Sequence, residues 1–440
     1  MEAHNPNPNN VHALRLELNV VNDSLYNAVV TVPQHCVAAI YKQAARSQQQ
    51  TIVTHGFAKG EVPLNYIEHN FKAALVEHVQ EFLFNYFVLN FLYHEIRNRK
   101  LLVAGDPRVL SIDMDPEHDA HFTFALTLFT PIELQEWKYF PFKAPKRKKY
   151  KDLDRQVDAF IKEEKDNFDH HGASSDVRIG DWVSFDVVLV DEKQCPLFTE
   201  HTQNLWVKIG DEEADSTLRE LFAGKKIGDT FCSSNKGLHD YFSPHLEHSY
   251  AFCISVVDIV HNAYFCLESF KKYFKLKNNK DIYQKLIEVF SFRNDLSQRR
   301  SMVEEAFKVL LSKHRFSVPN HLILRQLDKV MRAIQSNPDY HVYRMQKDFK
   351  ERARQLAEKQ AREEIIIDQI AYQEHIVANH QDIKTYLNLI KRPRTKEFIY
   401  FTPPLSKLRG QEAPLSTEEL RIACSREKTL NHIIFHLTQK

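Results

Sequence analysis

The segment with the clearest potential for binding chemistry is a short glycine-rich stretch between two helix-like regions. It reads His55-Gly56-Phe57-Ala58-Lys59-Gly60-Glu61-Val62-Pro63 and holds two of the chain's ten glycines. Glycine adopts backbone angles that other residues avoid, and a residue before proline disfavours helix, so we expect an exposed loop here. Such a loop would present Phe57 and Lys59 outward, apolar area beside a positive charge. This pairing suits docking onto another macromolecule, and an ordinary surface connection is the alternative.

Signals for covalent or metal chemistry are weak. No serine, cysteine or threonine lies in a nucleophile motif, and no phosphate-binding glycine loop is present. His94-Glu95 lacks the second histidine of a zinc protease helix. Two further groups of residues could be arranged as metal ligands, namely His118 with His121, and His239 with Asp240, His245 and His248. Such groups are common by chance in a chain with 23 histidines. We therefore expect no metal ion and no cofactor.

Length and composition restrict the class of protein. A chain of 440 residues is too long for one compact core, so two to four domains are expected. The net charge of +1 argues against naked nucleic acid as the main partner. Six scattered cysteines without a CxxC pair indicate reduced thiols. The N-terminus is polar, and the apolar run 82–93 is too short for a membrane span, so we expect a cytoplasmic protein without a membrane partner.

The glycine-rich loop must be positioned by the elements around it. Residues 13–20 and 26–32 alternate apolar and polar side chains, which predicts a strand pair, and Pro33 suits the first turn of a helix that follows. Apolar positions from Ile67 recur every three to four residues and predict one amphipathic helix ending near Arg97. Strand-like alternation returns at residues 109–114 and 122–128. A sheet crossed by helices fits this order.

The middle and the end of the chain differ in character. Residues 177–259 hold several short strand patterns and one helix-like stretch at 214–223, which predicts a small half-barrel sheet wrapped on one helix. From residue 263 the patterns are helical, with a break at 315–320 and a long charged helix at 347–378. The tail at 403–414 is expected to be extended, and Thr417 opens a last helix.

The glycine-rich loop resembles the ribosome-docking sequence of bacterial trigger factors, Gly-Phe-Arg-x-Gly-x-x-Pro between two helices. The matching positions are Gly56, Phe57, Lys59, Gly60 and Pro63. Ala58 stands where the family has arginine, and Glu61 stands where it usually has lysine. The resemblance implies that this loop, Ala58 included, binds the large ribosomal subunit beside the exit tunnel. Losing a cation and gaining an anion should weaken attraction to a phosphate-rich surface.

The resemblance extends over roughly residues 13–440 in the family's domain order. It implies an α+β multidomain protein with an α/β docking domain, a small half-barrel domain similar to FKBP-type prolyl isomerases, and an elongated all-α chaperone domain with helical arms. The expected segments are a disordered N-terminus (1–12), the ribosome-binding domain (13–142), a linker (143–175), the isomerase-like domain (176–260) and the helical domain (261–440). The basic run 143–151 is read as part of the linker, with a contact to rRNA as the alternative.

The isomerase-like domain departs from its family at the pocket. Isomerases of this type hold the proline ring in a dry aromatic pocket. Here Val187 stands where the family has an aromatic residue on the pocket wall. Phe198 is the only residue that remains of the family's Phe-acid-Gly-Gly segment, and residues 214–218 stand in place of the Ile-Pro-Gly-Phe-like loop. Asp215 is expected on the pocket rim, and Leu218 is the last residue of the segment at the position of the pocket loop. We expect the fold to be kept and isomerase activity to be weak or absent.

The function implied by the resemblance is an ATP-independent chaperone that docks near the exit tunnel and holds nascent and unfolded polypeptides. Clients would bind between the helical arms by burial of apolar area, at roughly 25 cal/mol per Å². The family also implies a possible homodimer away from the ribosome. The alternatives are an active prolyl isomerase acting on folding proteins and a free-standing helical scaffold without ribosome binding.

Overall fold

The structure is a computed structural model that describes most of the chain. The described residues are 14–129, 132–144, 175–191, 193–198, 202–243, 250–261, 296–335, 337–391, 399–403, 407–408 and 410–438, with a few positions between 155–162 and 271–286. The predicted disordered N-terminus and most of the predicted linker 143–175, including most of the basic run 143–151, lie outside them. The chain divides into two compact units: unit 1 is 1–128, 175–261 and 404–420, and unit 2 is 129–174, 262–403 and 421–440.

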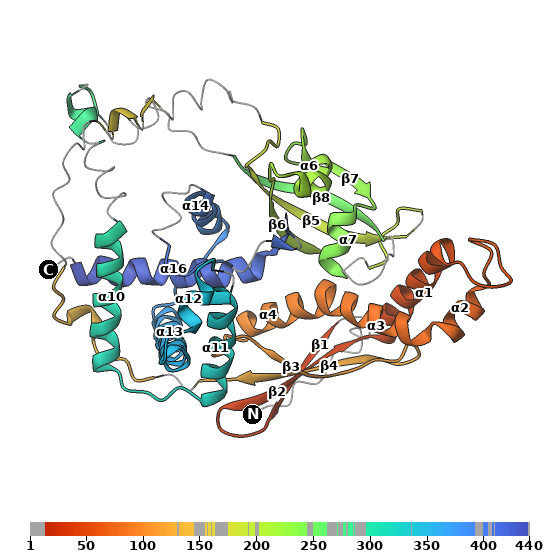
Figure 1. The fold of residues 1–440 in the computed structure, drawn as a ribbon, viewed down its shortest axis with the longest axis horizontal. Helices are drawn as coiled ribbons and strands as arrows, with labels where there is room; N and C mark the ends of the chain where they lie inside the picture. Colours follow the sequence, from red (N-terminus) through yellow and green to blue (C-terminus); the bar gives the residue numbers. More distant parts are fainter. Residues whose placement is uncertain are drawn as a thin grey trace. The chain divides into compact units, whose positions relative to one another are not determined.

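The first part of unit 1 is a four-stranded antiparallel sheet. Its order is β1 (Arg15–Val20), β2 (Leu25–Val32), β4 (Ala120–Thr127) and β3 (Arg108–Asp113). The predicted strands are confirmed, because alternating residues such as Ala28, Val30 and Phe122 are fully buried on one face. Helices α3 and α4 lie along this sheet in Figure 1.

The helices of this part follow the predicted order with one correction. They are α1 (Gln34–Thr51), α2 (Leu64–Asn70), α3 (Lys72–Leu83), a π-helical turn η1 (Phe84–Val88) and α4 (Leu89–Asn98). The prediction of one uninterrupted helix from Ile67 is wrong, because the backbone leaves helical geometry at Phe71 (φ −116°, ψ 16°). The Asn70 side chain donates to the Tyr66 carbonyl oxygen at 2.9 Å, a local bond that competes with helix continuation.

The second sheet of unit 1 has five strands in the order β11-β6-β5-β8-β7. These strands are β5 (Trp182–Val190), β6 (Gln203–Lys208), β7 (Thr230–Ser233), β8 (Ala251–Val260) and β11 (Leu415–Ser416). The 3-10 turn η3 (Glu213–Asp215) leads into the predicted helix α6 (Ser216–Phe222). The expectation of a single helix is wrong, because α7 (Lys236–Phe242) also forms, with Asn235 accepting the Gly237 N–H at its N-terminus.

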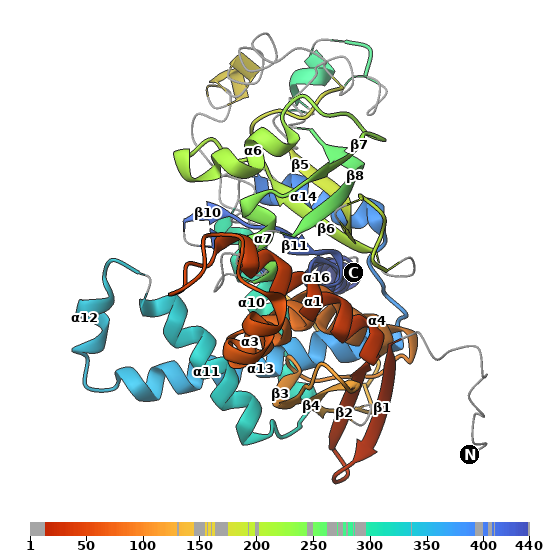
Figure 2. The same ribbon diagram turned by 90° about the vertical axis from the view of Figure 1, so that its right-hand side faces the viewer.

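The tail of the chain completes this second sheet. Strands β9 (Lys407–Leu408) and β10 (Gln411–Glu412) form a small hairpin, and β11 pairs with β6 through Leu415 opposite Trp206. Figure 2 shows β11 next to β6 in the second sheet. We call residues 407–408 and 410–420 the C-terminal strap. Its place in the sheet was not predicted, although its extended course was.

Unit 1 has one continuous hydrophobic core that joins both sheets. The ring of Phe82 on α3 lies 4.4 Å from that of Tyr250, and Tyr86 packs edge-on against Phe242 at 5.2 Å. The Tyr86 hydroxyl oxygen also accepts the backbone N–H of Leu189 on β5 at 2.9 Å. These contacts fix the second sheet against the helices of the first part.

Unit 2 is helical in the residues that the structure describes outside the short 3-10 turn η2 (Trp137–Tyr139) and connecting segments. Its helices are α10 (Leu296–Lys313), α11 (Asn320–Gln335), α12 (Tyr340–Arg344), α13 (Phe349–Gln373), α14 (His380–Lys391) and most of α16 (Thr417–Thr438). The predicted break before Asn320 and the long charged helix are confirmed. Phe307, Ile366, Ile370 and Leu430 form the centre of its own core.

Helices α11 and α13 pack as a hairpin with α12 at its end (Figure 2). Val330 faces Ala353 and Ala357 in a small apolar cluster, and small residues allow the two helices to approach closely. No helix in the described part of the chain is both long and apolar enough to cross a membrane.

Candidate functional site

The loop at residues 55–63, which we call the docking loop, joins α1 to α2 through two tight turns. Gly56 (φ +92°) and Gly60 (φ +87°) both adopt left-handed backbone angles that favour glycine. The Glu61 N–H donates to the Ala58 carbonyl oxygen at 3.0 Å and closes the second turn. Val62 is fully buried, and its carbonyl oxygen accepts from the Gln49 side chain at 2.6 Å. The loop is therefore shaped by its glycines and anchored at one end.

The tip of the docking loop exposes its charges but not its aromatic ring. Ala58, Lys59 and Glu61 are exposed, as the sequence predicts. The prediction that Phe57 points fully outward is wrong, because its half-buried ring packs 5.5 Å from Tyr66 on α2. Packing on Tyr66 removes part of the apolar surface of the Phe57 ring from water, which is more favourable than leaving the ring fully exposed. Phe57 and the partly exposed Tyr66 thus form an aromatic pair behind a charged tip.

The four predicted isomerase-pocket residues lie in the core of unit 1. Val187 is fully buried, and Phe198 and Leu218 are 7% and 2% exposed. The Phe198 ring packs edge-on against Phe87 of η1 at 5.1 Å. All three side chains belong to the hydrophobic core of unit 1, where they act as packing residues.

Asp215 is not on a pocket rim, and that prediction is wrong. Its side chain is buried, and its carboxylate accepts the Glu412 N–H at 2.6 Å. A buried carboxylate is stabilised by such hydrogen bonds. An ideal Cβ on Gly210 would lie 1.8 Å from Asp215 Oδ2, so the carboxylate occupies the space that the missing side chain leaves. Asp215 therefore anchors the C-terminal strap.

Further hydrogen bonds hold the strap to both parts of unit 1. Ser416 Oγ donates to Asn90 on α4 at 2.8 Å, and Thr417 Oγ1 donates to Asn204 on β6 at 2.5 Å. Arg97 forms a 2.8 Å ion pair with Glu418. Sequence reasoning missed these contacts because no local pattern indicates partners separated by hundreds of residues.

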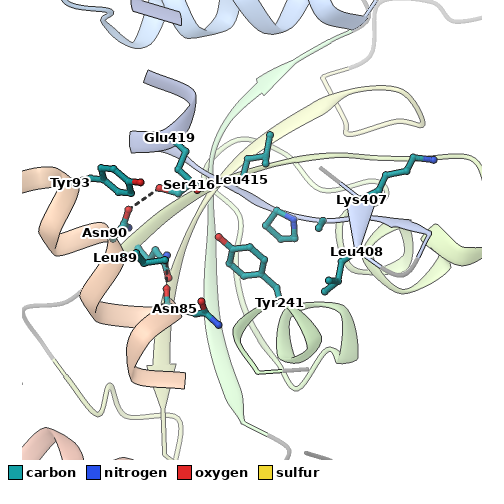
Figure 3. A pocket seen from close by; sticks show the side chains of 13 residues that line it. Asn85, Leu89, Asn90, Tyr93, Tyr241, Lys407, Leu408, Leu415, Ser416 and Glu419 are labelled. Carbon is teal, nitrogen blue, oxygen red and sulfur yellow. Dashed lines mark hydrogen bonds between the residues drawn. The ribbon is translucent and has the colours of Figure 1, made fainter. Parts of the chain in front are cut away.

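A cavity of about 270 Å³ lies between α4, α7, β6 and the strap. Figure 3 shows Tyr241 and Leu89 on its walls, with Ser416 bound to Asn90 at one side. Gln203, only 4% exposed, also lines the cavity, and its Oε1 has no hydrogen-bond partner among the residues that the structure describes. Burial raises the pKa of Glu419 above its usual range, opposed by a hydrogen bond from the Ser416 backbone. The cavity lining therefore includes both a hydrogen-bond acceptor and apolar side chains.

A buried polar chain connects α3 to α7 and β8. His78 Nε2 lies 2.6 Å from the Tyr250 hydroxyl, and Ser243 Oγ lies 2.8 Å from His78 Nδ1. Ser243 also donates to Glu81 at 2.9 Å. The residue types match those of serine hydrolases, but Ser243 is fully buried and is hydrogen-bonded to the acid, so it cannot reach a substrate. The chain satisfies buried polar groups in the core.

No group of three or more histidine, cysteine or acidic side chains in the described residues is arranged to hold a metal ion. Two of the histidines considered from the sequence, His245 and His248, lie outside those residues.

Comparison with known families decides the relationship. The model of the bacterial trigger factor protein matches residues 17–164, and the model of the trigger factor C-terminus matches residues 280–397. Together the two matches cover more than half of the chain. The chain belongs to the trigger factor family. It is thus a divergent member of a family of chaperones that act in protein folding, and its multidomain α+β fold agrees with that family.

Individual relatives show how divergent the chain is. The trigger factor of Salinibacter ruber is 23% identical over 376 residues, covering 78% of each chain. The trigger factor of Geotalea uraniireducens is 19% identical over 381 residues, covering 83% of this chain and 86% of the relative. One solved structure, from work on promiscuous substrate recognition by the trigger factor chaperone, aligns with 96% of this chain and 100% of the solved chain. The two sequences are 13% identical, and the TM-score is 0.35.

Proposed function

We propose that this chaperone docks on the ribosome through the docking loop and holds nascent or unfolded polypeptides without a nucleotide. The observation that carries the proposal is the loop geometry. The two motif glycines both need left-handed angles, and between them the backbone presents Lys59 to solvent. A loop that only connects two helices needs neither the paired glycines nor an exposed cation between them.

The charge at the tip makes the proposed contact weak and not strongly salt-dependent. Lys59 and Glu61 are both exposed and nearly cancel, and Ala58 adds no cation. Each cation placed on a phosphate adds to both affinity and salt dependence. Binding would therefore depend mainly on the Phe57–Tyr66 pair and on Lys59.

Client polypeptides would contact exposed apolar side chains, and helix α12 offers the clearest group. Val342 is 64% exposed and Met345 is 83% exposed, with Tyr343 beside them at 39%. Flexible methionine and aromatic side chains adapt to varied apolar partners. Such a surface binds by removing apolar area from water and needs no specific sequence in the client.

Ribosome co-sedimentation tests the docking step with vacant ribosomes at low and moderate salt. The wild type should pellet with ribosomes, and Phe57→Ala/Lys59→Ala should not. Because Phe57 also packs on Tyr66, the charge reversal Lys59→Glu at an exposed position is a second variant that leaves the loop packing intact and should also lose binding. Tyr343→Ala/Lys347→Ala removes an aromatic ring and a lysine from another exposed site and should bind like the wild type. Failure of the wild type to pellet would favour the free-standing scaffold.

We also propose that the isomerase-like domain is catalytically weak or inactive. Its support is the burial of Val187, Phe198, Asp215 and Leu218 in the core. The full chain should not accelerate cis–trans isomerisation of a short proline peptide, and an active prolyl isomerase as positive control should. Acceleration that an FKBP-pocket ligand abolishes would instead support the enzyme. The domain boundaries, the cytoplasmic location, a homodimer and an rRNA contact through residues 143–151 stay predictions.

A further inference from the structure

Two cysteines face each other across the outer strands of the second sheet. Cys232 on β7 is the direct register partner of Cys253 on β8. Strand β7 is the last strand at its side of the sheet within the described part of the chain. Both thiols are free, and both side chains are half-buried.

The backbone hydrogen bonds define what kind of pair this is. The Val256 N–H donates to the Asp229 carbonyl oxygen at 2.9 Å, and the Val256 carbonyl accepts from the Gly228 N–H at 2.8 Å. Val256 and Asp229 therefore mark a hydrogen-bonded position of the ladder. Hydrogen-bonded and non-hydrogen-bonded pairs alternate along an antiparallel ladder, and Cys253 and Cys232 lie three residues further along their strands. They therefore form a non-hydrogen-bonded pair, in which the Cα atoms lie about 4.5 Å apart. That separation is inside the range of roughly 4.4–6.8 Å found in disulfides.

Neighbouring contacts agree with this placement. Thr230 and Ser255 are also direct partners, two residues away on the same face, and their side-chain oxygens lie 3.1 Å apart. Burial raises the pKa of the Cys253 thiol, and a hydrogen bond with Cys232 raises it further. The two cysteine side chains therefore lie opposite each other on one face of the sheet, where both are partly open to solvent.

We propose that Cys232 and Cys253 are a reversible disulfide site for low-molecular-weight disulfides of the glutathione disulfide type. The thiolate of one cysteine attacks a sulfur of the small disulfide, forms a mixed disulfide and releases one small thiolate. The second cysteine, as its thiolate, attacks the protein-bound sulfur of that mixed disulfide and releases the other small thiolate. The protein loses two electrons and two protons, and one small disulfide is reduced to two thiols.

The bridge would bind the edge strand β7 covalently to β8 and close a loop that contains α7. A closed loop lowers the entropy of the unfolded chain, so the oxidised protein should be the more stable form. The raised pKa of Cys253 keeps it mainly as a thiol near neutral pH, so exchange should accelerate as pH rises.

The test incubates the full chain with glutathione disulfide and glutathione at a series of ratios, quenches the thiols, and maps peptides by mass spectrometry. We expect a peptide pair linked through Cys232 and Cys253, two mass units lighter than the reduced pair, and reversal by added thiol. The melting temperature of unit 1 should rise by several degrees on oxidation. Cys195→Ser, at an exposed cysteine, should keep the link and the shift, whereas Cys232→Ser should lose both.

Three results would contradict the proposed disulfide site. If Cys195 forms a mixed disulfide while Cys232 and Cys253 give no linked peptide, the proposal is wrong. Mixed disulfides at Cys232 or Cys253 that never close into a bridge would also overturn it. A melting shift that persists in Cys232→Ser would show that oxidation acts elsewhere.

Discussion

At Gly210, one missing side chain determines whether the C-terminal strap can be held. The carboxylate of Asp215 occupies the space in which a Cβ would lie, and the same carboxylate binds the Glu412 N–H. The Gly210 backbone angles are not left-handed in this structure, so the requirement for glycine is steric. A side chain at this position would have to displace a buried, hydrogen-bonded group.

The substitution Gly210→Ala should therefore destabilise unit 1 by about 1–3 kcal/mol, because overpacking shifts side chains and backbone by that order. Urea unfolding followed by the fluorescence of Trp182 and Trp206 measures the change. Glu213→Ala, at an exposed position on the adjoining turn, should change the free energy of unfolding by less than about 0.5 kcal/mol. An unchanged midpoint for Gly210→Ala would show that Asp215 can move without loss.

The docking loop allows a gain-of-function prediction. Replacing Ala58 with Arg and Glu61 with Lys restores the family's charges at two exposed positions. Ribosome affinity should rise at low salt, and its salt dependence should become steeper, by a slope of roughly one per new phosphate contact. Binding is measured by co-sedimentation over a salt series. The charge-matched variant Asp339→Lys/Gln346→Arg, on the exposed α12 region, should not reproduce the effect.

At the scale of elements, the strands and helices with repeated patterns are those that the sequence could predict. In β2, Ala28, Val30 and Val32 alternate with less buried residues, so a period of two is visible in the sequence. Strand β11 has two residues and α7 has seven, which is too short for any periodicity to be recognised. Both form because the surrounding sheet and core stabilise them.

The candidate site was predicted less completely than the fold. Its glycine turns and the exposure of Lys59 follow from local residue preferences, and those predictions hold. The packing of Phe57 on Tyr66 and the burial of Asp215 depend on partners elsewhere in the chain. The partner of Asp215 is 197 residues away, so no window of local sequence contains that information.

The strap itself gives an element-scale prediction. Leu415 is 3% exposed and pairs with β6, so Leu415→Asp would place a carboxylate in the core and destabilise unit 1 by roughly 2–5 kcal/mol. Limited proteolysis should cut the released strap, and the urea midpoint of unit 1 should fall. Lys407→Ala removes only an exposed ion pair with Glu212 and should leave both measurements nearly unchanged. A protease-resistant strap in Leu415→Asp would contradict its role.

A buried carboxylate on α13 predicts how the stability of unit 2 depends on pH. Burial is the main cause that raises the pKa of Glu363 above its usual 4.5, against hydrogen bonding from Tyr400 and the charge of Lys359. The folded state then holds the proton more tightly than the unfolded chain. The stabilising contribution is full below about pH 4.5 and is lost as pH rises through the raised folded value.

Glu363→Gln should therefore flatten the dependence of the unfolding free energy of unit 2 on pH above 4.5. The measurement is urea unfolding at a series of pH values with Trp137 as the reporter. Glu358→Gln, at an exposed position on the same helix, should keep the wild-type slope. Equal slopes for all three proteins would exclude Glu363 as the cause.

At the scale of the whole molecule, the two units have separate hydrophobic cores. The unit 1 core contains Phe82 and Tyr250, and the unit 2 core contains Phe307 and Leu430. Proteins with several cores commonly depart from two-state unfolding. The three tryptophans are divided between the units, with Trp137 in unit 2 and the other two in unit 1.

Denaturation should consequently show two transitions. Trp137→Phe leaves fluorescence only from unit 1, and Trp182→Phe/Trp206→Phe leaves it only from unit 2. We expect different urea midpoints for the two reporters, and far-ultraviolet circular dichroism of the wild type should show both. Coincident midpoints by all three probes would mean that the units unfold as one.

The place of the strap in unit 1 has a consequence for how the molecule is made. Translation proceeds from the N-terminus, so β5 and β6 leave the exit tunnel long before β11 exists. Until then β6 has an open edge, which is a site where strands of other chains can add. Asp215 likewise has no Glu412 N–H to bind. During synthesis, this member of a chaperone family therefore passes through a long interval in which one of its own strand edges is unpaired.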